Sequence, residues 1–141
     1  MFKNYLLTAV MFFFASAVFA QGNSWTEYFS NDDVKVSFKK RDCHYPEKGV
    51  HNQYVLLQIE NTSSEDFTIS FTLDRWYNQE KANPDVKEYS FEISANSSLS
   101  ASCDDKMDGL HVYSKILTQE PKSVLSKFEL SNIKINDTLV K

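Results

Sequence analysis

The chain has 141 residues, and its 15 Lys and Arg against 19 Asp and Glu give a formal charge of −4. That length suits one domain, and the acidic balance excludes nucleic acid as a partner, because binding to phosphates requires an excess of Lys and Arg. With three glycines in all, the sequence also lacks the Gly-rich phosphate-binding loops of nucleotide-binding enzymes.

Residues 1–20 have the pattern of a cleavable export signal. Lys3 precedes an apolar run over residues 5–14, and Val18-Phe19-Ala20 offers a cleavage site, while Ala17 offers a second one. The apolar run is shorter than the ~20 residues that a membrane-spanning helix requires. We therefore predict an exported protein, periplasmic or secreted, with no membrane span after cleavage and with an N-terminal segment, residues 21–33, before the folded domain.

The remaining chain, residues 34–141, is predicted to form a single β domain. Apolar and polar residues alternate in one short segment after another, which is the period of half-buried strands. Clusters of Asn, Asp and Ser separate these segments. In the last one the apolar phase changes near Ser131-Asn132, which predicts a β-bulge there. The predicted strands are 34–39, 53–61, 67–74, 89–93, 99–103, 110–116 and 124–135.

About seven short strands with turns at this spacing predict an all-β, antiparallel, Ig-like β-sandwich. The pattern resembles immunoglobulin-like sandwiches in strand number and length. It departs from the antibody-type core, because Cys43 precedes the second strand and Trp76 ends the third. The resemblance concerns architecture only and carries over no functional residues.

Two cysteines, Cys43 and Cys103, lie in the mature chain. An even number of cysteines in an exported protein favours a disulfide, and closing a loop of this length contributes roughly 4 kcal/mol. The alternative is a nucleophilic Cys43 thiol beside Arg41 and His44, which would leave Cys103 without a role. The basic run at residues 39–41 is interpreted as a solvated strand edge.

Neither the acidic nor the histidine residues match a known metal motif. The loop Asp104–Asp108 resembles the start of a calcium loop, but Lys106 and Lys115 occupy ligand positions of the helix–loop–helix pattern. An acidic turn is the simpler interpretation, and calcium binding stays open. His44 and His51 lie on one connection without the four ligands of a structural zinc site. We expect no metal and no cofactor.

The aromatic residues offer the best candidate site. Trp76 lies on the strand face predicted to point away from the core, and so does Tyr54. A half-exposed Trp has the amphipathic chemistry that protein and glycan interfaces use. The sequence therefore predicts ligand binding by Trp76, Tyr77, Arg75 and Tyr54. The alternative is that these side chains cover a sheet edge or pack under the connection around residues 43–52.

In sum, the sequence predicts a monomeric, non-catalytic binding protein whose partner is an extracytoplasmic protein or glycan. Two alternatives stay open. One is an inhibitor of secreted hydrolases or proteases that inserts the loop Asp42–Asn52 into an active site. The other is a small enzyme with a shallow site around His44, His51 and residues 104–108.

Overall fold

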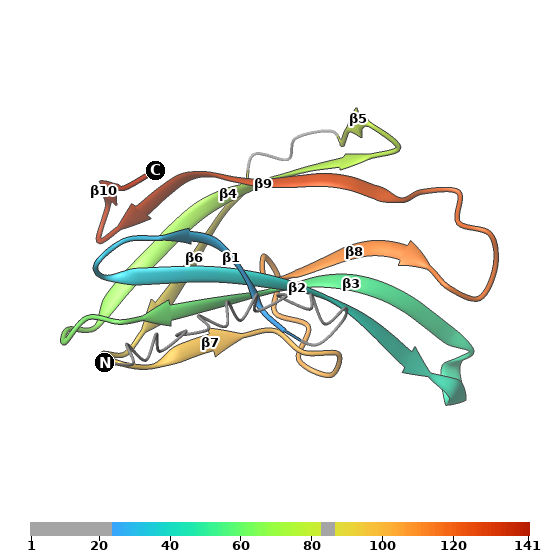
Figure 1. The fold of residues 1–141 in the computed structure, drawn as a ribbon, viewed down its shortest axis with the longest axis horizontal. Helices are drawn as coiled ribbons and strands as arrows, with labels where there is room; N and C mark the ends of the chain where they lie inside the picture. The colour runs from blue at the N-terminus through green and yellow to red at the C-terminus, as the bar shows by residue number, and fades with distance from the viewer. Residues whose placement is uncertain (1–23, 83–86) are drawn as a thin grey trace, which may run out of the picture.

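The computed structural model describes residues 24–82 and 87–141, and these form an all-β, antiparallel structure (Figure 1). No α-helix occurs within the described ranges; a single 3-10 turn, η1 (Pro46–Lys48), joins two strands. The predicted signal at residues 1–20 lies outside the described residues, and so does Asn83-Pro84-Asp85, one of the polar clusters between predicted strands. In the described part, no helix is long and apolar enough to cross a membrane.

The first of the two sheets, sheet A, is centred on the strand β3. β3 pairs with β2 on one side, and β1 pairs with the outer edge of β2. On its other side β3 pairs with both β7 and β8, which occupy successive stretches of the same edge. Its strands are β1 (Thr26–Ser30), β2 (Val34–Tyr45), β3 (Val50–Asn61), β7 (Ser98–Ser100) and β8 (His111–Ile116).

The second sheet, sheet B, is centred on β4. β9 pairs with one side of β4, while β5 and β6 pair with the other, and β10 forms a short hairpin with β9. The seven predicted strands are present as β2, β3, β4, β6, β7, β8 and β9, and β1, β5 and β10 are additional. The strands of sheet B are β4 (Phe67–Tyr77), β5 (Glu80–Lys81), β6 (Glu88–Ile93), β9 (Leu125–Ile135) and β10 (Thr138–Leu139).

The core lies between the two sheets and is built from the alternation seen in the sequence. Both sheets contribute side chains that are almost fully buried in one apolar cluster. Burial of each such side chain stabilises the fold by about 1.5–3 kcal/mol. The buried strand residues include Val34, Val36, Val55, Leu57, Ile59, Phe67, Ile69, Phe71, Ile93, Val112, Leu130 and Ile133.

The predicted bulge in the last strand is confirmed. Ser70 pairs with Lys134 and Thr72 pairs with Ser131, so two residues of β9 face one residue of β4. Asn132 has a φ of 52° at this point, in the left-handed region that Asn tolerates. The extra residue lets both Leu130 and Ile133 enter the core.

The segment expected to be a long connection, residues 42–52, is instead the end of a β-hairpin. β2 continues to Tyr45, and its register with β3 is unbroken from the pair Val34–Asn61 to the pair Tyr45–Val50. Gly49 closes the turn with a φ of 61°. The prediction of strand 34–39 was too short because the charged run at residues 39–42 interrupts the apolar alternation. Pairing with β3 holds residues 40–45 extended.

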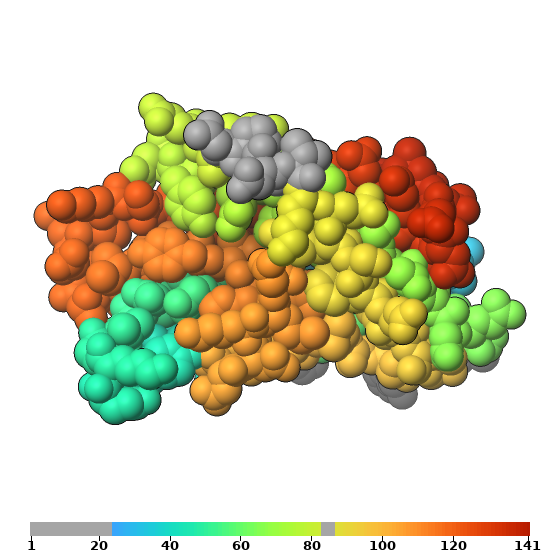
Figure 2. Space-filling model, turned by 180° about the vertical axis from the view of Figure 1, so that it is seen from behind, coloured from blue at the N-terminus to red at the C-terminus, as the bar shows by residue number. Residues whose placement is uncertain are grey.

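Between β7 and β8 the chain makes an excursion, residues 101–110, which we call the covering loop. The expected strand 99–103 stops at Ser100, and the loop leaves and rejoins β3 through hydrogen bonds of Ala101 N to Leu57 O and of Leu57 N to Leu110 O. Figure 2 shows this segment at the surface between the β2–β3 turn and β6.

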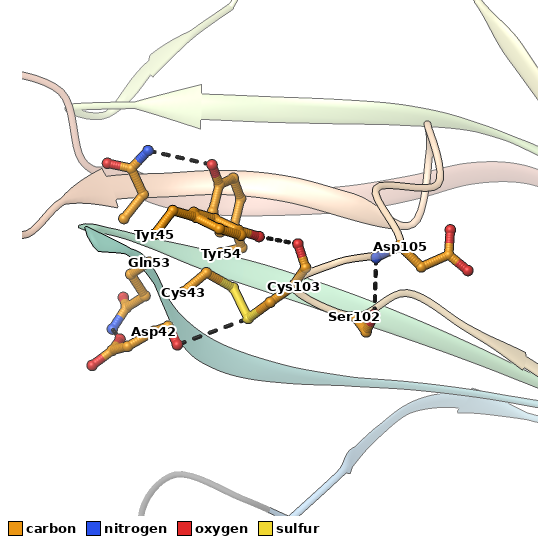
Figure 3. The surroundings of a disulfide bond; sticks show 9 residues. Asp42, Cys43, Tyr45, Gln53, Tyr54, Ser102, Cys103 and Asp105 are labelled. Carbon is orange, nitrogen blue, oxygen red and sulfur yellow. Dashed lines mark hydrogen bonds between the residues drawn. A yellow bond between two sulfur atoms is a disulfide. The ribbon is translucent and has the colours of Figure 1, made fainter. Parts of the chain in front are cut away.

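The predicted disulfide is present and fixes the covering loop to sheet A. Cys43 and Cys103 are joined, with Cα atoms 5.5 Å apart. In the register of β2, Cys43 points to the side opposite the core-facing Val34 and Val36, so the bond reaches the outer face of the sheet (Figure 3). The Tyr45 hydroxyl donates a hydrogen bond to the Cys103 carbonyl beside it.

Candidate binding face

Trp76 lies near the end of β4 on the outer face of sheet B. The alternation along β4 places it with Thr72 and Asp74, opposite the core-facing Phe71 and Leu73. Its side chain is half-buried and is not among those that pack against the core. The prediction that Trp76 faces away from the core is therefore confirmed.

Two lysines flank the Trp76 indole. Lys81 of β5 and Lys127 of β9 are its direct cross-strand neighbours, and their Nζ atoms lie 5.3 and 4.6 Å from the ring centroid. Because β5 and β9 border β4 on opposite sides, the two lysines reach the ring from opposite sides of the strand. Contacts of this geometry contribute about 0.5–1 kcal/mol each at exposed positions.

Each of the two lysines also forms an ion pair with a carboxylate. Lys81 Nζ lies 3.7 Å from Asp74 Oδ1, and Lys127 Nζ lies 3.4 Å from Glu129 Oε2. Each pair alone is weak because it is exposed to solvent. Together they place charges of both signs beside one aromatic ring. We call Trp76, Lys81, Lys127, Asp74 and Glu129 the Trp76 face.

The backbone under Trp76 is held by the β4–β5 turn. Asn78 and Gln79 have φ values of 50° and 70°, which two-residue hairpin turns require. Ser126 Oγ donates to Trp76 O at 3.1 Å and accepts from Gln79 N at 3.0 Å. Asn78 is in turn bonded through its backbone N to Val124 O at 2.9 Å. The turn and β9 therefore position Trp76 from both sides.

Tyr77 and Arg75 belong to the opposite face of β4, between the sheets. The Tyr77 hydroxyl donates to the Tyr113 carbonyl of β8 at 2.8 Å, which links sheet B to sheet A. Burial raises the pKa of Tyr77, and the neighbouring Arg75 opposes that shift. This contact gives Tyr77 a structural role.

Tyr54 lies on the outer face of sheet A, away from Trp76. Its ring centroid is 4.0 Å from that of His111 and 6.0 Å from that of Tyr113, and its hydroxyl accepts a hydrogen bond from Asn52 Nδ2 at 3.3 Å. Of the four residues predicted to bind ligand, Trp76 alone therefore lies on the outer face of sheet B, and the structure does not gather the four at one surface.

The three histidines are divided between two faces. His44 and His51 are cross-strand neighbours in the β2–β3 hairpin, with ring centroids 4.6 Å apart. His111 is on the outer face of sheet A, where burial, and then the charge of Lys106, lower its pKa. His111 Nε2 is buried without a hydrogen-bond partner among the described residues. His44 and His51, the two histidines of the predicted enzyme site, therefore lie together, and His111 lies apart from them.

The acidic loop does not form a metal cluster in the structure. Asp108 pairs with Lys87, and within residues 24–82 and 87–141 no three His, Cys, Asp or Glu side chains are grouped to hold a metal ion. A shallow pocket of about 380 Å³ lies at the other end of sheet B from Trp76, where the start of β4, the end of β6 and Asn136 line it. The three acidic residues for which the sequence left calcium binding open are Asp104, Asp105 and Asp108, all in the covering loop.

The sequence reasoning did not identify Lys81 and Lys127 as neighbours of Trp76. Finding them requires the register of β4 against β5 and against β9. The bulge in β9 shifts the second of these registers. Comparison of the chain with protein-family models, with curated proteins and with solved structures finds no match.

Proposed function

We propose that the chain is an exported, non-catalytic, monomeric binding protein that recognises a protein partner through the Trp76 face. The observation that carries this proposal is an indole held half-buried on an outer sheet face between Lys81 and Lys127. Trp is among the residues that contribute most binding energy at protein interfaces, because it buries a large area with little loss of conformational entropy.

The geometry favours a protein over a glycan. A sugar stacks on an open aromatic ring face, whereas the Nζ atoms of Lys81 and Lys127 lie over the Trp76 ring, 5.3 and 4.6 Å from its centroid. The ion pairs Lys81–Asp74 and Lys127–Glu129 present both charges beside the indole. Such a pattern gives register and selectivity against a partner with the complementary charges.

The disulfide supports export, because such bonds persist in oxidising compartments. The signal at residues 1–20 and a periplasmic or secreted location are part of this proposal. The two packed antiparallel sheets support the Ig-like β-sandwich predicted from the sequence, which also stays a proposal.

Trp76→Ala tests the function. The mature, disulfide-bonded protein would be immobilised, and fractions from outside the cytoplasm of the native host passed over it. Lys127→Glu reverses one charge of the Trp76 face, and Leu139→Ala is the matched control, because Leu139 is an exposed apolar residue (61 %) outside that face. We expect one protein to be retained by wild type and Leu139→Ala and lost with Trp76→Ala and Lys127→Glu.

Two results would change the conclusion. If the retained material survives protease treatment and is a glycan, the partner class is wrong while the Trp76 face stands. If every retained component binds Trp76→Ala as strongly as wild type, the Trp76 face is not the binding site.

A further inference from the structure

The β2–β3 hairpin ends at one end of the molecule (Figure 1), and its register places His44 and His51 directly opposite one another. Both side chains lie on the core-facing side of sheet A, but at the end of the hairpin, where the sheet extends past the core. His44 is exposed and His51 is half-buried. From this pair we infer a site for a divalent transition-metal ion of the zinc and nickel class, and the inference is independent of the proposed function.

The separation of the two rings matches that of a chelating pair. A metal–nitrogen distance of about 2.0–2.1 Å places an imidazole centroid about 3.2 Å from the metal. Two such ligands at an angle of about 90–110° then have centroids about 4.5–5.2 Å apart. The centroids of His44 and His51 are 4.6 Å apart, with ring planes inclined at 34°. Chelation then requires rotation about the Cβ–Cγ bonds that turns one nitrogen of each ring toward a common point.

The backbone that carries His44 is fixed from the opposite face of the sheet. Its neighbours along β2 are Cys43, which forms the disulfide, and Tyr45, whose hydroxyl binds the Cys103 carbonyl (Figure 3). Both attach β2 to the covering loop. The two ligands therefore need little rearrangement to bind, which lowers the entropic cost of chelation.

The backbone at His51 is held by the chain just after β8. The neighbouring cross-strand pair of the hairpin, Asp42 and Gln53, is polar. The His51 carbonyl accepts a hydrogen bond from Leu117 N at 2.8 Å. On the same face, Gln53 Nε2 donates to Asp42 Oδ1 at 3.1 Å, which gives the site a hydrophilic border. Imidazole nitrogens suit zinc, nickel and copper, whereas calcium and magnesium require oxygen ligands.

The site supplies two protein ligands. Among the described residues no third His, Cys, Asp or Glu side chain converges with another two, so water completes the coordination. An ion bound in this way keeps open positions, which a donor group of a second molecule can occupy. We expect binding to be weaker than at a closed four-ligand zinc site.

Calorimetric titration of the mature, disulfide-bonded protein without a histidine tag tests the inference, with Zn²⁺ and Ni²⁺ as separate probes. Wild type should bind one ion per chain. His44→Asn and His51→Asn should each weaken binding by at least about 100-fold, because each removes one of two ligands. His111→Phe is the matched control, because it removes the third histidine, on the other face, and should leave binding unchanged.

A second measurement does not depend on the variants. In wild-type protein, the imidazole NMR signals of His44 and His51 should shift or broaden together as Zn²⁺ is added, while those of His111 stay in place. Absence of Zn²⁺ and Ni²⁺ binding to wild type would overturn the inference. Binding that persists with His44→Asn and His51→Asn, or that perturbs the His111 signals instead, would overturn it as well.

Discussion

The outer faces of sheet A and sheet B arise from the same alternation of core-facing and outward-facing residues, but one face is covered and the other is open to solvent. On β3 and β4 alike, residues that alternate with the core positions point outward. On sheet A the covering loop lies over that side, and the outward-pointing Leu56 is 2 % exposed. On sheet B the outward side carries the Trp76 face, where the charged side chains meet solvent.

The difference shows that alternation settles which side of a strand meets the core but not what happens on the other side. Sheet A gains a second buried layer because one loop is tied across it by Cys43–Cys103. Sheet B has no such disulfide among its described residues, and its outer face is polar apart from Trp76 and the exposed Leu139. The covered face therefore contributes to stability, while the open face is available for binding.

The largest expected effect comes from removing the disulfide. Replacing both Cys43 and Cys103 with Ser should lower the free energy of unfolding by about 2–4 kcal/mol, because the unfolded chain regains the freedom that the bond removes. Urea denaturation measures this loss. The same variant should bind a hydrophobic dye more strongly if the covering loop lifts from the outer face of sheet A. Equal stability of wild type and variant would show that the loop is held by packing alone.

Gly109 provides the next test, at the point where the covering loop contacts β6 of sheet B. Gly109 has a φ of 92°, and a Cβ added there would lie 2.6 Å from the Tyr89 ring of β6. Gly109→Ala should therefore cost about 2–3 kcal/mol through strain and overpacking. Gly49→Ala is the matched control, since its φ is 61° but nothing lies within 4 Å of the added Cβ, and it should cost about 1 kcal/mol. Equal losses would mean that Tyr89 moves aside without cost.

The same two faces also show what could be predicted from the sequence. The seven main strands, the bulge near Asn132 and the disulfide follow from local alternation and from cysteine number. The path of the covering loop and the two lysines beside Trp76 could not be predicted, because they depend on register between distant strands. The separation of Trp76 from Tyr54 is of this kind: both residues were expected on outward faces, and the faces belong to different sheets.

Comparing one aromatic residue from each face sharpens the contrast. Tyr54 packs against the core cluster and against His111, so Tyr54→Ala should cost about 2 kcal/mol of unfolding free energy. Trp76 lies outside that cluster, so Trp76→Ala should cost less than about 1 kcal/mol. Thermal or urea unfolding of the two variants side by side measures the difference. A larger loss with Trp76→Ala would make Trp76 a structural residue and weaken its role in binding.

The smallest expected effect concerns the pH dependence of the covered face. Burial lowers the pKa of His111 in the folded protein, and the charge of Lys106 adds to this. The unfolded chain therefore binds a proton at a higher pH, at the ordinary histidine pKa of about 6.5. As the pH falls through that value the unfolded state takes up more protons than the folded state, and stability decreases until His111 is itself protonated.

His111→Phe keeps an aromatic ring against Tyr54 and removes the titration. Above about pH 7.5 the histidine is neutral in both states, so the difference in unfolding free energy between wild type and variant should be constant there. Between about pH 7 and pH 5 the wild type should lose stability relative to His111→Phe, by less than about 1 kcal/mol because solvent partly reaches the ring. Subtracting the two curves removes the contribution of other titrating groups. Parallel curves over this range would mean that the covering loop does not keep His111 from protonation.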